Sequence, residues 1–120
     1  FAFFEVVPLW AISTVALGGM ELSENDVGVV LSGSAIGTAA FTAWMMPRMT
    51  KAFGYRRVIA LATCAGALTL AVMPFTTSRP SLTFLVTVAN CTYCAIGASL
   101  ISCINNVVPR ARLASVNGIL

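Results

Sequence analysis

The sequence has little charge and no histidine. Of its 120 residues 9% are charged and 58% are hydrophobic, whereas a typical soluble domain carries about 25% charged residues. A soluble fold of this length could not bury so much apolar surface. Seven basic and four acidic residues leave a net charge of +3, and the basic residues lack the aromatic or glycine-rich surroundings that nucleic-acid binding would need. The composition therefore predicts a protein covered by membrane lipid, with no nucleic-acid partner.

The residues that carry most enzyme and metal chemistry are also missing. There is no histidine, no cluster of carboxylates and no nucleophile beside a base, so nothing indicates an enzyme. The four cysteines all lie in apolar runs. Cys91 and Cys94 form a C-x-x-C pair, but no second pair and no histidine complete a zinc site. We therefore expect packing cysteines, with no metal and no cofactor.

Long stretches without charge divide the chain into helical spans. Each of the three charge-free intervals after Asp26 is at least about twenty residues long, enough for an α-helix to cross the hydrocarbon. No alternating pattern indicates strands. The sequence predicts an all-α integral membrane protein, a polytopic helix bundle with spans at about 1–20, 27–46, 56–75 and 82–107 and the start of a fifth at 113–120. Both ends of the chain look cut, which suggests a fragment.

Basic residues gather in one connection between spans. The segment 47–57 holds Arg48, Lys51, Arg56 and Arg57, and it predicts a tight loop in which Gly54 adopts a positive φ. If the chain crosses at every span, this loop and the connection at 109–113 lie on one side with six basic residues. The other side has only Arg79. This bias places the first side in the cytoplasm.

Two local signals concern helix starts and helix packing. Ser23, followed three residues later by Asp26, is a variant of the capping box and predicts the start of the second helix there. Gly33-x-x-x-Gly37 lies among other small residues and predicts a helix that approaches a partner closely. By contrast, the span 56–75 has no polar stripe, so we expect it only to support the others.

The fourth span carries a polar face. Asn90, Cys94, Gly97, Ile101 and Asn105 recur at helical spacing, and Tyr93 borders them. An amide in lipid needs a partner, so this face should look inward. Two roles stay open: hydrogen bonding between helices, or lining a substrate path.

Glu5 is the only acid inside a span. A carboxylate near the bilayer centre costs roughly 2.5–3.5 kcal/mol, so such residues commonly bind protons or cations. The alternative is an interfacial acid at the start of a helix. The depth of the residue decides between these roles.

Three segments resemble the C-terminal half of a major facilitator superfamily transporter. The segment 47–57 is similar to the second, degenerate copy of the family's G-x-x-x-D-R-x-G-R-R loop, with matches at Gly54, Arg56 and Arg57. Lys51 stands where the motif has aspartate, which removes a charge-relay partner. The segment 8–28 resembles helix seven and its outer loop, and 105–118 resembles the connection from helix ten to helix eleven. Within the family, the sequence most resembles zinc-induced-facilitator-like and drug–proton antiporter members.

The resemblance implies a role for each part of the chain. It implies an incomplete C-terminal transmembrane half, residues 1–120, of a twelve-helix secondary transporter that moves a small solute by alternating access with protons. Its partners would be lipid and the missing N-terminal half. The expected substrate path comprises Glu5, Trp10, Asn90, Tyr93, Cys94 and Asn105. The expected cytoplasmic gate comprises Arg48, Lys51, Gly54, Arg56 and Arg57.

Two other classes fit the same hydrophobic pattern. One is a complete small multidrug exporter of four helices, with Glu5 as its proton and cation site. The other is a four-span scaffold or assembly subunit that transports nothing. A scaffold would have no water-accessible face on the fourth span, so the accessibility of Asn90 or Cys94 separates it from a transporter.

Overall fold

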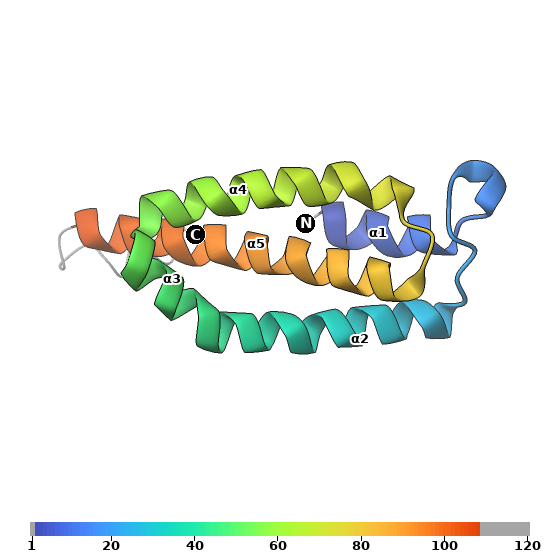
Figure 1. The fold of residues 1–120 in the computed structure, drawn as a ribbon, viewed down its shortest axis with the longest axis horizontal. Coiled ribbons are helices and arrows are strands. Elements are labelled where there is room, and N and C mark those ends of the chain that lie inside the picture. Colours follow the sequence, from blue (N-terminus) through green and yellow to red (C-terminus); the bar gives the residue numbers. More distant parts are fainter. Residues whose placement is uncertain (1, 109–120) are drawn as a thin grey trace.

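The computed structural model describes residues 2–108, which are largely helical and contain no strand in that range. The elements are α1 (Ala2–Ile12), η1 (Val15–Leu17), α2 (Glu24–Ala40), η2 (Phe41–Met45), α3 (Met46–Phe53), α4 (Tyr55–Val72), η3 (Met73–Phe75) and α5 (Arg79–Val107). They form an elongated bundle of 55 × 29 × 22 Å. In Figure 1, α5 runs between α2 and α4, and the shorter α1 begins about midway along it. The predicted fifth span lies outside the described residues.

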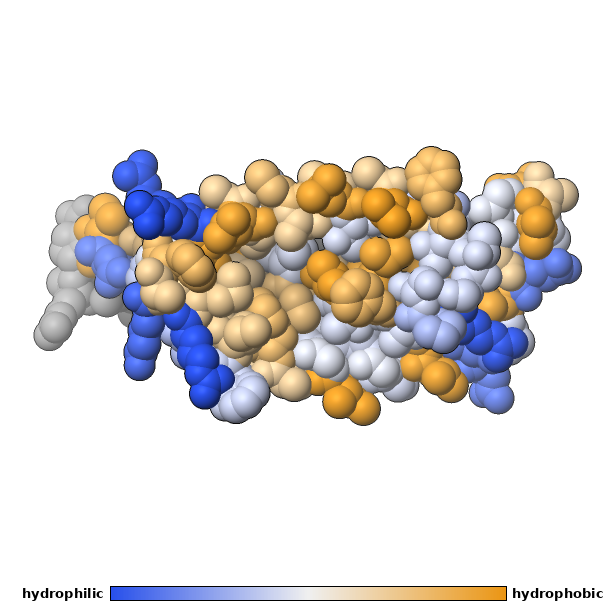
Figure 2. Space-filling model, in the orientation of Figure 1, coloured by the Kyte–Doolittle hydropathy of each residue, from blue (hydrophilic) through white to orange (hydrophobic). Residues whose placement is uncertain are grey.

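Three helical segments are long and apolar enough to cross a membrane: Glu24–Phe53, Tyr55–Phe75 and Arg79–Val107. Many of their large apolar side chains are exposed, among them Ile36 and Leu68. In Figure 2 the hydrophilic side chains gather at the two ends of the bundle, and apolar side chains cover much of the length between them. Lipid is the solvent that suits such a surface. The predicted all-α, multi-pass membrane fold is therefore confirmed.

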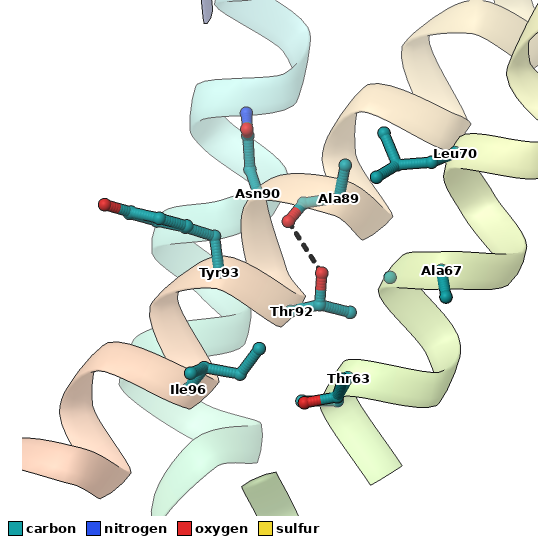
Figure 3. Close-up of a pocket in the computed structure, with 10 residues that line it drawn as sticks. Thr63, Ala67, Leu70, Ala89, Asn90, Thr92, Tyr93 and Ile96 are labelled. Atoms are coloured by element: carbon teal, nitrogen blue, oxygen red, sulfur yellow. Dashed lines mark hydrogen bonds between the residues drawn. The ribbon is translucent and has the colours of Figure 1, made fainter. Parts of the chain in front are cut away.

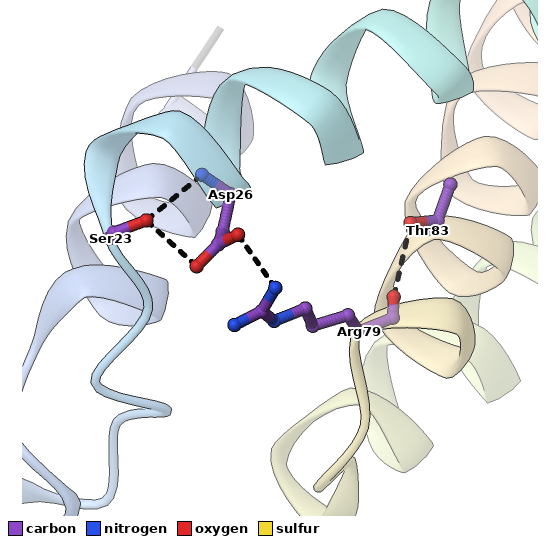
Figure 4. A network of polar contacts seen from close by, with 4 residues as sticks. All are labelled: Ser23, Asp26, Arg79 and Thr83. Carbon is purple, nitrogen blue, oxygen red and sulfur yellow. Dashed lines mark hydrogen bonds and ion pairs between the residues drawn. The ribbon is translucent and has the colours of Figure 1, made fainter.

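One end of the bundle, the acidic end, carries Glu21, Glu24 and Asp26. As predicted, Ser23 caps α2: the Asp26 backbone N–H donates to Ser23 Oγ at 3.2 Å, and Ser23 Oγ donates to Asp26 Oδ2 at 2.7 Å. The other carboxylate oxygen, Asp26 Oδ1, lies 2.7 Å from Arg79 Nη1. This ion pair joins the start of α2 to the start of α5 (Figure 4).

The first helix is shorter than the predicted span of residues 1–20. α1 ends at Ile12, and the chain then folds back on it: the backbone N–H of Glu21 donates to Ser13 O at 2.9 Å and that of Leu22 to Ala11 O at 3.0 Å. The Ser13 hydroxyl also donates to Leu9 O. These bonds satisfy carbonyls that a continuing helix would have used. The apolar run at 1–20, predicted as one span, therefore forms a helix as far as Ile12 and a folded-back segment after it.

The opposite end of the bundle, the basic end, carries Arg48, Lys51, Arg56 and Arg57. The predicted loop at 47–57 is mostly helical, because α3 continues α2 as far as Phe53, with Pro47 in its first turn, where the missing N–H is tolerated. The turn is confined to Gly54, whose φ of 76° confirms the predicted need for glycine. Between α2 and α3 lies a π turn, in which the Met46 N–H donates to Phe41 O, five residues back.

The positions of residues 24 and 51 allow a direct test of whether the chain crosses the membrane between them. Glu24 and Lys51 lie at opposite ends of one continuous helical segment, about 40 Å apart at 1.5 Å per residue. Cysteines introduced at 24 and 51 of the full-length protein should react with a membrane-impermeant thiol reagent from opposite sides of sealed vesicles. Permeabilised vesicles, in which both should react, are the control. Reaction of both from one side would contradict a helix that crosses the membrane.

Candidate functional site

A pocket of about 360 Å³ lies between α4 and α5 near the middle of the bundle (Figure 3). Small residues on both helices leave this space, because the side chains of alanine and glycine are too short to fill the gap between the two backbones. Its lining residues are Ala62, Thr63, Gly66, Ala67 and Leu70 of α4 and Ala89, Asn90, Thr92, Tyr93 and Ile96 of α5. The pocket contains no charged side chain, so it suits a neutral or largely apolar group with few hydrogen-bonding atoms.

The pocket continues the face of α5 on which α1 rests. Near the acidic end, Val7 and Ala11 of α1 belong to one core cluster with Leu82 and Val86 of α5. Further along α5 the same three- and four-residue spacing leads from Val86 to Asn90 and Tyr93. α1 therefore contributes to the core at this face near the start of α5, and the pocket lies on the same face further along α5.

Asn90 is the most informative residue of the pocket. Its Nδ2 donates a long hydrogen bond, 3.4 Å, to Ser34 Oγ on α2. Its Oδ1 is buried and has no hydrogen-bond partner within residues 2–108. A buried acceptor without a donor costs about 1–3 kcal/mol, so this oxygen is suited to accept a hydrogen bond from a group that the described chain does not supply. Sequence reasoning missed Ser34 as the partner, although it lies on the small-residue face around Gly33.

The predicted polar face of α5 is divided between two environments. Near its centre it packs on α2, where Asn90 meets Ser34 and Cys94 is half-buried. Towards the basic end Asn105 is exposed. Tyr93 is 55% exposed and lines the pocket. The structure therefore brings Asn90 and Tyr93 together at the pocket, and it does not bring Asn105 there.

The two predicted site residues of α1 lie apart from the pocket. Trp10 Nε1 donates to Gly18 O at 2.8 Å, which fastens the outer loop to the helix. Glu5 is exposed, whereas Val7 is buried in a core cluster with residues of α2, η3 and α5. Side chains two positions apart on an α-helix, such as those of Glu5 and Val7, point in directions about 200° apart around its axis. Glu5 therefore points away from the bundle. It precedes the end of α1 by seven residues, about 10 Å of helix, and so lies well inside the bundle's length.

α4 contributes more than the predicted support. Thr63, Ala67 and Leu70 form the wall of the pocket that faces Thr92 and Ile96 of α5 (Figure 3). A polar stripe was the signal sought in the sequence, but this wall is nearly apolar. Alanine and glycine at 62, 66 and 67 were the available sign that the helices would leave a space.

At the basic end one arginine is held by its own helix. The Arg48 guanidinium lies 4.2 Å from the centroid of the Trp44 ring, and Arg48 Nη1 donates to Trp44 O at 3.3 Å. The spacing of four residues was a sequence signal for this contact. Lys51, Arg56 and Arg57 are exposed. In the part of the chain that the structure describes, none of these four residues forms an ion pair.

Comparison with known proteins gives two relatives from Arabidopsis thaliana. The chain is 30% identical to a probable peptide/nitrate transporter over 98% of its own length. It is also 30% identical, over the same share of its length, to the protein ZINC INDUCED FACILITATOR 1. The chain spans 26%, about a quarter, of each relative. No family model matches the sequence, and no solved structure matches it.

Proposed function

Because this chain is related over nearly its whole length to transporters of the major facilitator superfamily, we propose that the complete protein is a secondary transporter that moves a small solute by alternating access. The resemblance seen in its motifs is confirmed, and the relatives are transporters rather than enzymes. In the proposed cycle two helical halves rock about a site near the midplane. The chain supplies helices seven to ten and the start of eleven in this assignment.

The observation that carries the substrate path is the Asn90 carboxamide. Its Oδ1 is buried without a donor among residues 2–108 at mid-length of α5, and the residue lines the pocket. A polar group at this depth is costly unless it is used, and unpaired polar groups in membrane helices commonly mark transport paths. Asn90 and Tyr93 are the proposed substrate contacts, with Cys94 and Asn105 further along the same path. The Asn90 amide and the Tyr93 phenol are uncharged, so they would orient a solute by hydrogen bonds and would not neutralise a charge on it.

Proton coupling is assigned to Glu5. Its side chain is exposed on α1, about 10 Å of helix from the end of α1, where another part of the complete protein would face it. Trp10, one turn and a half further along α1, would border the same space. Antiport of the solute against protons is the form of coupling we propose.

The basic end is the proposed gate on the cytoplasmic side. Arg48, Lys51, Arg56 and Arg57 surround the turn at Gly54, and they could bind helix C-termini or carboxylates of neighbouring helices when that side closes. Arg48 already donates to the Trp44 carbonyl of its own helix, which holds the guanidinium near the turn. Because Lys51 replaces the aspartate of the family motif, the gate would rely on attraction to acids outside this chain.

Thiol accessibility tests the transporter against the scaffold. In the full-length protein with Cys64, Cys91, Cys94 and Cys103 replaced by serine, a cysteine at 90 should react with an impermeant methanethiosulfonate, and added substrate should slow the reaction. The matched control is a cysteine at Leu68, an exposed apolar position on α4. It should react at least about tenfold more slowly, because lipid suppresses the thiolate that reacts.

The result decides between the two classes. Equal, slow reaction at positions 90 and 68, with no effect of substrate, would favour a scaffold whose Asn90 only joins helices. A small exporter of four helices is the weaker rival, because the chain aligns with a quarter of much longer transporters.

A further inference from the structure

The basic end combines unpaired cations with exposed aromatic rings. Trp44 is 71% exposed, Phe53 49% and Tyr55 37%, and they lie in the same stretch of chain as the four basic residues. All four acids of the sequence lie elsewhere, Glu5 on α1 and the others at the acidic end. The ion pair of the described residues, Asp26–Arg79, is also at the acidic end. Four cations at the basic end thus repel one another with no carboxylate of residues 2–108 to offset them.

The depth of this cluster matches the surface of a bilayer. An α-helix needs about 20 residues to cross the hydrocarbon, so a crossing that begins at Val27, just after the capped start of α2, reaches the far surface near Met46. Trp44 lies at that boundary, where tryptophan rings are commonly found. Arg48 and Lys51 lie one and two turns beyond it, at the level of lipid headgroups.

The π turn and α3 shape the cluster. α3 leaves the line of α2 and runs obliquely towards the start of α4 (Figure 1). Met46 is buried and Met49 is half-buried, whereas Arg48 and Lys51 are exposed, so α3 has an apolar side on the bundle and a cationic side outside. The Arg48 guanidinium is stacked on Trp44 at 4.2 Å. A stacked guanidinium keeps N–H groups at its edge that can bind phosphate oxygens.

We propose that α3 and the first turn of α4 form a binding site for anionic phospholipid headgroups, built from Arg48, Lys51, Arg56 and Arg57 with Trp44 at the hydrocarbon boundary. Charge complementarity selects the phosphate and carboxylate of a lipid such as phosphatidylserine. The exposed apolar surface beside the cluster selects a lipid over a free anion, because the acyl chains can pack where the headgroup binds. This inference does not depend on the proposed transport, since lipid binding is measured without substrate.

The association of spin-labelled lipids with the full-length protein tests the proposal. The purified protein, reconstituted in phosphatidylcholine, should restrict spin-labelled phosphatidylserine more strongly than spin-labelled phosphatidylcholine. The substitution Lys51→Gln should reduce that preference by about fivefold at this site. Glutamine at all four basic positions should abolish the preference. High salt should weaken it as well, because the cluster is exposed.

The matched control is Arg79→Gln, which removes one positive charge at the acidic end and should leave the preference unchanged. Since every variant is purified before reconstitution, a change in the direction of membrane insertion does not affect the measurement. Size-exclusion elution shows whether a variant is folded, and Trp44→Leu, which keeps every charge, should weaken the preference less than the four-fold substitution does.

Three outcomes would overturn the proposal. The first is an unchanged preference for phosphatidylserine in the variant that lacks all four charges. The second is an equal loss in Arg79→Gln, which would indicate net charge alone. The third is displacement of the spin-labelled lipid by soluble glycerophosphoserine at a similar concentration, which would show a site for free phosphate compounds.

Discussion

Replacing Glu5 with glutamine is expected to abolish proton-driven accumulation of substrate by the full-length transporter, without loss of folded protein. Glutamine has nearly the shape of glutamate but cannot exchange a proton near neutral pH. A carboxylate in the membrane interior costs roughly 2.5–3.5 kcal/mol, so its removal should leave the free energy of unfolding unchanged or raise it. Loss of function with retained stability is therefore the expected combination. Uptake driven by a pH gradient into vesicles, together with thermal unfolding, measures both.

The position of Glu5 explains why so large an effect is expected. The side chain lies about 10 Å of helix inside the acidic end and points away from Val7 and the core. Glu5 lies in the first turn of α1, so the alternative of an interfacial acid at a helix start predicts normal proton-driven uptake in Glu5→Gln. Glu24→Gln is the matched control, because Glu24 is exposed at the acidic end, and its proton-driven uptake should be normal. Normal uptake in Glu5→Gln would remove Glu5 from the coupling mechanism.

A methyl group added at Gly37 is expected to destabilise the bundle by about 1–3 kcal/mol, the usual cost of overpacking. A Cβ at this position would lie 2.6 Å from Thr87 Cγ2 on α5. The Thr87 hydroxyl donates to Thr83 O at 2.7 Å, so its methyl group cannot rotate away without loss of that bond. Gly37→Ala should lower the unfolding temperature, and far larger side chains should prevent folding.

Two further variants make the explanation specific. Gly28→Ala, on the same helix, places a Cβ with no atom within 4 Å and should keep or raise the stability, because alanine favours the helix. Adding Thr87→Ser to Gly37→Ala removes the methyl group that collides and keeps the hydroxyl, so stability should return. If the double variant is as unstable as Gly37→Ala, the close approach of α2 and α5 is not the cause. The double-mutant cycle measures this coupling directly.

Local chemistry made several parts of the fold predictable. The Ser23 cap and the glycine turn at 54 follow from the residues themselves. The end of α1 at Ile12 was not predictable from hydropathy, because the residues after it are apolar too. The backbone N–H groups of Glu21 and Leu22 donate to Ser13 O and Ala11 O after the chain has reversed its direction. Such pairing depends on the tertiary structure.

The candidate site was only partly predictable for a similar reason. Helical spacing placed Asn90 on a polar face. It could not predict that the Asn90 amide would donate a hydrogen bond to Ser34 of α2. The pocket depends on small residues of α4 that carry no polar signal. Spacing defines the faces of a helix, whereas the choice of neighbour for each face depends on how the helices pack.

The π turn makes the number of residues between α2 and α3 as important as their identity. Each α-helical residue advances the chain by about 100° and 1.5 Å, and the bond from Met46 to Phe41 accommodates one residue more than a regular turn would. Removing one residue from this segment would restore the regular ladder and keep Arg48 and Lys51 on the same side of the helix, whereas the same deletion elsewhere in α2 would rotate them by about 100°. A gap in an alignment at 41–45 would therefore leave the same residues at the bilayer, and a gap elsewhere in α2 would turn another face toward it.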